Sequence, residues 1–184
     1  MKDKYLRETR MVDFSNPAIQ KLIQNMKWKE MGEFERIKAI YNYVRDDVLF
    51  GYNIDDGISA SKVLADGYGQ CNTKGTLFMA ILRACNIPCR VHGFTIDKKL
   101  QKGAMTGVVY KNAPQNVFHS WVEVYFEDRW YELEAFILDK KYLQKLQKSL
   151  FYPEIPVSYS WLSHPSLLSD AHCHWSRRIR RLHR

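Results

Sequence analysis

The chain has 184 residues, of which 46% are hydrophobic and 14% aromatic, and its formal net charge at pH 7 is +8. This length supports one domain with a sizeable core, and no stretch reaches the roughly 18 apolar residues that a membrane-spanning helix needs. The N-terminus lacks the apolar segment of an export signal, so we expect a cytoplasmic protein whose four cysteines are free thiols.

The basic excess is concentrated at the C-terminus. Residues 171–184 contain five arginines and no acidic residue, so the rest of the chain has a net charge of only +3. We predict a single domain over residues 1–170, followed by a basic, disordered tail at 171–184. No basic groove is evident elsewhere, so we expect no nucleic-acid partner and no membrane partner.

The first half of the chain is predicted to be mainly helical. Asn16 and Pro17 form a helix-start signal, and the apolar residues that follow recur every 3.6 residues up to Met26. A second helix is predicted at about 33–48, where apolar side chains line one face. A turn-rich connection at 51–57 and a short helical segment at 61–65 come next. We interpret both long helices as scaffold.

The stretch 66–84 carries the strongest signal for chemistry. Gly67 and Gly69 allow a tight turn, and apolar residues from position 77 onward form the stripe of a helix that packs by one face and begins at Cys71. A thiol at a helix start is near unpaired N–H groups and the positive end of the helix dipole, which favour the thiolate. Those N–H groups could also hold an oxyanion, and the simplest alternative is a buried structural cysteine.

The second half alternates in the manner of β-strands. Strands are predicted at 89–96, 118–126 and 130–136, with a possible short strand at 108–110 and a helix at 139–150. The period of two places His119 and Trp121 on one face of their strand. A turn at 127–128 makes this strand the neighbour of the one that carries Glu132 and Glu134.

These residues could form a site for acyl transfer. The reaction needs a nucleophilic thiol, a histidine that exchanges the proton, and a polar group that orients the imidazole. Chain order supplies Cys71, His119 and either Glu132 or Glu134, and the residues alone do not choose between the two glutamates. Tyr52 and Tyr68, which come shortly before Cys71, could reach the thiol, with half-buried packing as the alternative reading.

Four ordered elements carry a resemblance to a known family. They are Gly69-Gln70-Cys71, Leu82-Arg83-Ala84-Cys85-Asn86-Ile87-Pro88-Cys89-Arg90-Val91, His119-Ser120-Trp121-Val122-Glu123-Val124-Tyr125 and Trp130-Tyr131-Glu132-Leu133-Glu134. Together they resemble the transglutaminase-like superfamily over about residues 34–136, which we take as the core of the domain. The resemblance implies an α+β fold, with N-terminal helices and a central cysteine-bearing helix packed on an antiparallel β-sheet.

The resemblance also assigns roles. By it, Cys71 is the nucleophile, His119 the base and Glu134 the orienting acid. Glu134 stands where the family usually has aspartate, so the strand or the imidazole must shift to keep a hydrogen bond. Asn86 replaces a glycine at the helix end, where asparagine tolerates left-handed backbone. We expect the oxyanion and substrate-binding residues to be Gln70, Tyr68, Tyr52 and Trp121.

The implied chemistry is cleavage or transfer at amide carbonyls, without a cofactor and with a peptide or protein substrate. We expect hydrolysis of a peptide or amide, or glutamine deamidation or cross-linking, and favour hydrolysis because the sequence displays no channel for an amine. The alternative is a non-catalytic module that binds a peptide or protein through aromatic residues between 142 and 161. The sequence indicates no oligomeric state.

Cys85, Cys89 and His92 could also be interpreted as part of a zinc site, although packing is the stronger interpretation. Cys85, Cys89 and His92 have the spacing of half a zinc site, which one of His172, Cys173 and His174 would complete. Cys85 falls on the apolar face of its helix and Cys89 at a small-residue position of the family element, so packing explains both. We therefore predict no metal site.

Overall fold

The computed structural model of the chain describes residues 3–101, 107–134, 136–141 and 144. It divides into two compact units, one formed by residues 1–94 and 119–140 and the other by residues 95–118 and 141–184. The first unit carries every residue predicted to take part in chemistry. The described part of the second unit, residues 95–101 and 107–118, holds a short 3-10 helix at Lys98–Gln101 and helix α5 at Gly107–Asn112.

Four α-helices of the first unit follow the predicted order. They are α1 (Pro17–Met26), α2 (Glu33–Asp46), α3 (Ala60–Asp66) and α4 (Cys71–Ala84), with short 3-10 helices at Asp3–Tyr5 and Trp28–Glu30. The helix-start signal at Asn16 is confirmed, since its side-chain oxygen accepts a hydrogen bond of 2.9 Å from the backbone N–H of Ala18. Asn86 has φ of 62°, the left-handed backbone expected after α4.

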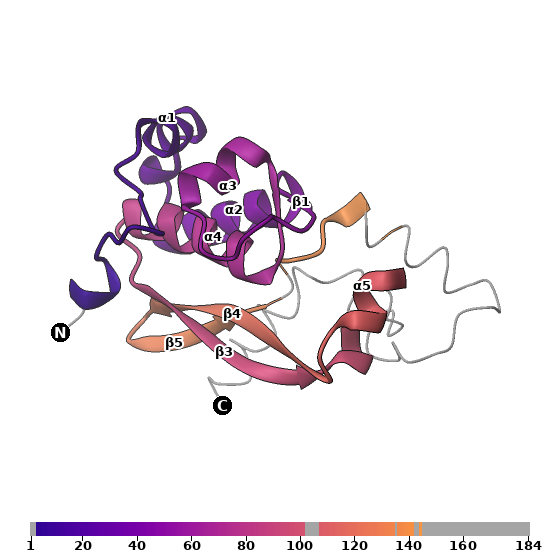
Figure 1. The fold of residues 1–184 in the computed structure, drawn as a ribbon. Coiled ribbons are helices and arrows are strands. Elements are labelled where there is room, and N and C mark those ends of the chain that lie inside the picture. The colour runs from indigo at the N-terminus through magenta and orange to yellow at the C-terminus, as the bar shows by residue number, and fades with distance from the viewer. Residues whose placement is uncertain (1–2, 102–106, 135, 142–143, 145–184) are drawn as a thin grey trace. The chain divides into compact units, whose positions relative to one another are not determined.

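Helix α4 is buried on all sides, so the prediction of a helix that packs by one face is wrong. Every residue from Thr73 to Leu82 is buried. Helices α1, α2 and α3 contact α4 on one side, and the sheet lies on the other (Figure 1). Small residues permit this approach: a Cβ atom added to Gly75 would lie 3.8 Å from both Val122 and Phe136.

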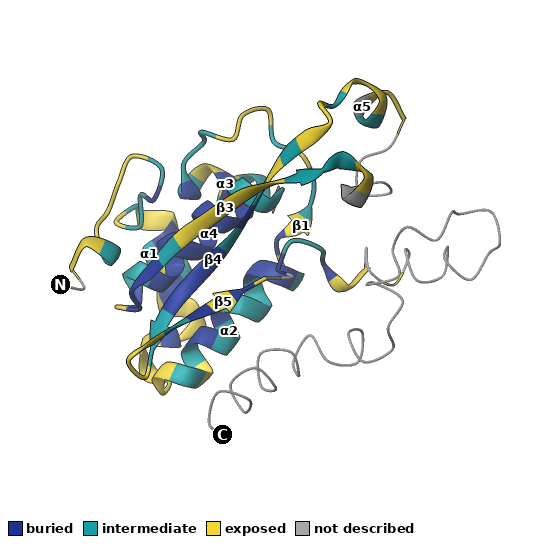
Figure 2. Ribbon diagram, turned by 90° about the horizontal axis from the view of Figure 1, so that it is seen from below, coloured by how far each residue is buried: buried dark blue, intermediate teal, exposed yellow. Residues whose placement is uncertain are grey.

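The sheet has the order β3, β4, β5, with β3 at Cys89–Asp97, β4 at Asn116–Phe126 and β5 at Arg129–Leu133. Strands β4 and β5 are antiparallel, with Val122 opposite Leu133, and their turn has positive φ at Glu127 and Asp128, as a tight hairpin requires. Ser120, Val122 and Val124 are buried, whereas most residues of β3 are exposed, as their colour in Figure 2 shows. The last strand ends at Leu133 rather than at 136.

Two features differ from the predictions. Residues 108–110, predicted as a possible strand, lie in α5. Two side chains donate hydrogen bonds to backbone carbonyls of this helix, Asn112 to that of Val108 and Lys98 to that of Tyr110. A two-stranded parallel pair, β1 (Leu49–Phe50) with β2 (Tyr68–Gly69), was not predicted, since two residues are too few to show a period.

Some predictions fall mostly or wholly outside the described residues. These are the helix at 139–150, the aromatic surface between 142 and 161, and the basic tail at 171–184. The single domain over residues 1–170 stays a prediction. Within the described residues, none of the helices combines the length and the apolar character that crossing a bilayer requires.

A fully buried lysine ties α4 to its surroundings. Lys74 lies one turn into α4, and its ammonium nitrogen donates to the backbone carbonyls of Val48 at 2.7 Å, Ile137 at 2.9 Å and Arg45 at 3.2 Å. These three acceptors match the three protons of an ammonium group. Burial lowers the pKa of Lys74 to about 7, while the carboxylates of Asp139 and Asp46 oppose the change.

Replacing this lysine should destabilise the fold. In Lys74→Met the three carbonyls lose a donor, and we expect the free energy of unfolding to fall by about 3 kcal/mol in urea denaturation at pH 7. Because the folded-state pKa is about 7 and the ordinary value 10.5, the unfolded chain binds more protons between these pH values. The stability difference between wild type and Lys74→Met should therefore grow from pH 7 to pH 9.

The exposed Lys62, which pairs with Asp66 on α3, supplies the matched control Lys62→Met. This variant should lower the free energy of unfolding by less than about 0.5 kcal/mol, because an exposed ion pair contributes little to stability. A stability difference for Lys74→Met that shrinks as the pH rises would contradict the lowered pKa.

Candidate active site

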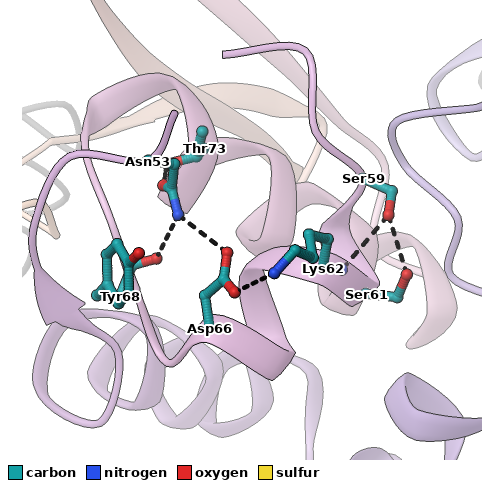
Figure 3. A network of polar contacts seen from close by, with 7 residues as sticks. All are labelled: Asn53, Ser59, Ser61, Lys62, Asp66, Tyr68 and Thr73. Carbon is teal, nitrogen blue, oxygen red and sulfur yellow. Dashed lines mark hydrogen bonds and ion pairs between the residues drawn. The ribbon is translucent and has the colours of Figure 1, made fainter. Parts of the chain in front are cut away.

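The turn before Cys71 is built around a glycine. A Cβ atom on Gly69 would lie 2.5 Å from Oγ1 of Thr73 and 3.0 Å from Cγ of Lys74, so no larger residue fits without a shift. Asn53 supports the turn, since its amide nitrogen donates to the backbone carbonyl of Tyr68 and to Asp66 at 3.3 Å each (Figure 3). The chain therefore enters α4 along a fixed path.

Gln70 caps the start of α4. Its backbone N–H donates to Oγ1 of Thr73 at 3.0 Å, one half of a capping box. Both ends of its side-chain amide are engaged: Oε1 accepts from the backbone N–H of Asn53 at 2.9 Å, and Nε2 donates to Asp56. These bonds hold the residue before Cys71, and the predicted oxyanion role of Gln70 stays a prediction.

Asn72, which the sequence does not single out, connects three elements. Its Nδ2 donates to Oδ2 of Asp56 at 3.0 Å, and its Oδ1 accepts from the hydroxyl of Ser120 on β4 at 2.8 Å. The thiol of Cys71 lies 3.6 Å from the same Oδ1. An asparagine at the second position of a helix has no distinctive sequence pattern, so only the tertiary contacts identify it.

The Cys71 thiol is half-buried at the first position of α4. Burial raises the pKa of this thiol above its ordinary value, and the Asp56 carboxylate adds to the effect, while hydrogen bonds from Ser120 and Asn72 oppose it. The expectation that the helix start favours the thiolate therefore gives the wrong direction, because loss of hydration outweighs the nearby donors. The resting residue is a thiol.

His119 lies on β4 next to Ser120. Its ring is half-buried and meets the ring of Phe94 edge-on, with centroids 5.6 Å apart. Burial lowers the pKa of His119, so the imidazole is neutral at pH 7, and the Glu134 carboxylate opposes this shift. No hydrogen bond joins His119 to Cys71 or to Glu134 among the contacts of the described residues.

The two glutamates that the residues left open differ in position. Glu134 follows β5, acts electrostatically on His119, and has its backbone carbonyl held by the Tyr41 hydroxyl at 2.7 Å. Glu132 lies opposite Glu123 in the register of β4 and β5. The charge of Glu134 therefore acts on the imidazole and opposes the fall in its pKa.

Trp121 belongs to a group of aromatic rings beside His119. It stacks on His92 with centroids 4.5 Å apart and meets Phe94 edge-on at 4.9 Å. His92 is held by Glu123, at 3.2 Å between Nδ1 and the carboxylate. The Nε1 atom of Trp121 is buried and has no hydrogen-bond partner among the described residues. Its predicted substrate-binding role is untested.

The remaining predicted residues are placed as follows. Tyr52 and Tyr68 are partly exposed, at 49% and 39%, and the Tyr68 ring lies against Gly51. Cys85 and Cys89 are buried in the core. His172, Cys173 and His174, which could complete a zinc site, fall outside the described residues.

Comparison with known proteins identifies a family. Residues 20–135 match the transglutaminase-like superfamily. In an alignment of 111 positions that covers 55% of this chain, the sequence is 29% identical to YebA of Bacillus subtilis (strain 168), an uncharacterised protein. The chain spans 15% of the length of YebA.

Two solved structures share the fold. A candidate cysteine protease from Cytophaga hutchinsonii aligns with a TM-score of 0.57 at 22% identity, over 76% of this chain and 43% of that one. The periplasmic domain of TgpA from Pseudomonas aeruginosa, bound to ethylmercury, aligns with a TM-score of 0.50 at 14% identity, over 73% and 48%. The α+β architecture with a helix-start cysteine on an antiparallel sheet is therefore confirmed.

The turn before the cysteine can be tested by overpacking. In Gly69→Ala the new Cβ collides with Thr73, and we expect the free energy of unfolding to fall by about 1–3 kcal/mol. Gly32→Ala is the control and should lower the free energy of unfolding by less, since a Cβ atom added there would have no described atom within 4 Å. If chemical denaturation gave equal decreases for the two variants, a side chain at Gly69 would not strain the turn more than one at Gly32.

The ionisation of Cys71 can be measured directly. We expect its rate of alkylation by iodoacetamide, followed by peptide-resolved mass spectrometry, to rise with a midpoint above about 8.5, the value of a free cysteine. The urea-unfolded chain provides the reference midpoint. A folded-state midpoint below that of the unfolded chain would contradict the conclusion that burial raises the pKa of this thiol.

Proposed function

The chain belongs to the transglutaminase-like superfamily, and from this premise we propose that it catalyses acyl transfer at amide carbonyls with Cys71 as nucleophile, His119 as base and Glu134 as orienting acid. The observation that carries the proposal is the hydrogen bond between Ser120 and Asn72, which fixes the start of α4 against β4. It joins the neighbour of the thiol to the neighbour of the imidazole.

The two pKa shifts indicate how the proton moves. Burial raises the pKa of Cys71 and lowers that of His119, so the resting pair is a thiol and a neutral imidazole. In the proposed reaction the imidazole approaches the thiol and takes its proton as sulfur attacks the carbonyl carbon. This is general-base catalysis rather than attack by a preformed thiolate.

The rest of the cycle follows from the same groups. The carbonyl oxygen becomes an oxyanion, which the N–H groups of Cys71 and Asn72 can hold because they lack partners within the helix, whereas the N–H of Thr73 is capped by Gln70. His119 returns the proton to the departing amine, and the acyl group stays on Cys71 as a thioester. Water, activated by His119, then releases the acid and regenerates the thiol.

Glu134 would stabilise the imidazolium in these steps. Its carboxylate already opposes the fall in the pKa of His119, which is the expected action of an orienting acid. Glutamate has one methylene more than the aspartate usual in the family, and the hydrogen bond from Tyr41 to the Glu134 carbonyl fixes the backbone from which it reaches.

We propose a peptide or protein as substrate and water as acceptor. The partly exposed Tyr52 and Tyr68, on segments that lead to Cys71, and Trp121 beside His119 are the side chains proposed to contact the substrate. A primary amine in place of water would give glutamine cross-linking from the same thioester, and this is the competing reaction to test.

Activity can be tested with two probes, a quenched-fluorescence peptide library for hydrolysis and casein with a labelled primary amine for cross-linking. We expect peptide cleavage that Cys71→Ala abolishes, that His119→Ala lowers by about 10²-fold or more, and that Glu134→Gln lowers by at least about tenfold. The reaction should keep its rate down to the ordinary histidine pKa of about 6.5 and lose it only at lower pH, because burial lowers the pKa of His119 and protonated His119 cannot accept the thiol proton.

Cys85→Ala is the matched control, since this buried thiol lies at the opposite end of α4. It should retain the wild-type rate. Label incorporation without cleavage would move the assignment from hydrolase to transferase. If the protein neither cleaved the peptides nor incorporated the label, that result would count against catalysis.

The alternative is a non-catalytic binding module on the same fold. It predicts that a peptide or protein partner binds Cys71→Ala as tightly as wild type. A pull-down with both forms, read against the activity assay, separates the two functions.

A further inference from the structure

We propose that the Ser120 hydroxyl is a switchable hydrogen-bond donor for the sulfur of Cys71, set in place by the side chains of Asn72 and Asp56. In the resting site it donates to Asn72, and when the thiol gives up its proton it turns to the sulfur anion. The inference rests on the proposed function in taking Cys71 as the nucleophile. Ser120 is then a catalytic residue, and Asn72 and Asp56 are positioning residues.

Asp56 decides which way the Asn72 amide faces. An ionised carboxylate only accepts hydrogen bonds, so the group that Asn72 directs at Asp56 must be its NH₂, at 3.0 Å. Asp56 also accepts from the amide of Gln70, so one carboxylate holds the residues on both sides of Cys71. The Oδ1 atom of Asn72 is left facing the thiol and β4.

Two donors meet at this oxygen. The hydroxyl of Ser120 lies 2.8 Å from Oδ1 and the sulfur of Cys71 lies 3.6 Å from it, so the thiol and the hydroxyl share one acceptor. Ser120 is 2% exposed, which leaves its hydroxyl without ready access to water. A hydroxyl rotates freely about its C–O bond, and its proton can exchange one close acceptor for another.

Loss of the thiol proton changes the balance of these contacts. The thiol no longer donates to Oδ1, and the sulfur anion becomes the strongest acceptor near Ser120, so the hydroxyl proton turns from oxygen to sulfur. The proton lost by the thiol goes to the His119 imidazole, and Ser120 keeps its own. The charged group that acts on the sulfur is Asp56, from the segment before α4.

Burial explains why such a donor matters. The half-buried sulfur is poorly hydrated, and the Asp56 carboxylate opposes negative charge on it. Hydrogen bonds from the N–H and the hydroxyl of Ser120 act in the opposite direction. A donor that forms its strongest bond only with the anion favours the reacting state over the resting one.

The test is the pH profile of Cys71 alkylation by iodoacetamide in the full chain, which requires no substrate. In Ser120→Ala the anion loses its donor, so the midpoint should lie about one pH unit higher and alkylation at pH 7 should fall about tenfold. In Asn72→Ala the competing oxygen is gone and the hydroxyl can donate to sulfur at once, so the midpoint should fall. Ser61→Ala, which removes a hydroxyl of α3 that is bonded to Asp13, should leave the midpoint unchanged.

The opposite directions of the two variants are the decisive result, because a general loosening of the site would move both midpoints the same way. An unchanged midpoint in Ser120→Ala, or an upward shift in Asn72→Ala, would overturn the proposal. If Ser120→Ala does not fold, an upward shift in Asn72→Ala still overturns the proposal. The shifts can appear in a chain that cleaves no peptide, so this inference and the proposed function fail separately.

Discussion

The burial of α4 is the constraint on which the rest of the structure depends. A helix enclosed along ten consecutive residues must find partners within the protein for every polar group that it carries. The Lys74 ammonium donates to three backbone carbonyls outside α4. The Thr73 hydroxyl donates to the side chain of Asn53 and accepts from the backbone N–H of Gln70. The polar residues at the start of α4 thereby fasten the preceding turn, α2 and the chain after β5 to one helix.

The same enclosure sets the ionisation of Cys71, the proposed nucleophile. A helix start exposed to water would favour a thiolate through its N–H groups. Cys71 is instead half-buried near the Asp56 carboxylate, so the pKa of its thiol rises, and burial lowers the pKa of His119. Both shifts favour the uncharged forms of the pair, so the proposed reaction would separate charge only as it proceeds.

The two faces of strand β4 carry residues with different contacts. Ser120, Val122 and Val124 are buried, and the Ser120 hydroxyl meets the first turn of α4, whereas His119 and Trp121 belong to the group of rings with Phe94 and His92. Consecutive residues therefore supply the hydroxyl bonded to Asn72 and the proposed base. The alternation of a strand makes this division obligatory, since neighbouring side chains point to opposite faces.

The sequence by itself predicted helices α1 to α4, the three strands of the larger sheet and the family, because periodicity, caps and short motifs are local signals. It also made Cys71 and His119 candidates for a site, whereas the choice of Glu134 over Glu132 came from the family resemblance. It could not show that α4 is buried on all sides, since the apolar stripe marks only one face, nor that residues 108–110 are helical. The tertiary structure alone decided the contacts of Asn72, Asp56, Ser120 and Lys74. Their hydrogen bonds join residues far apart in the chain, and the pKa of Cys71 depends on the burial that those distant segments impose.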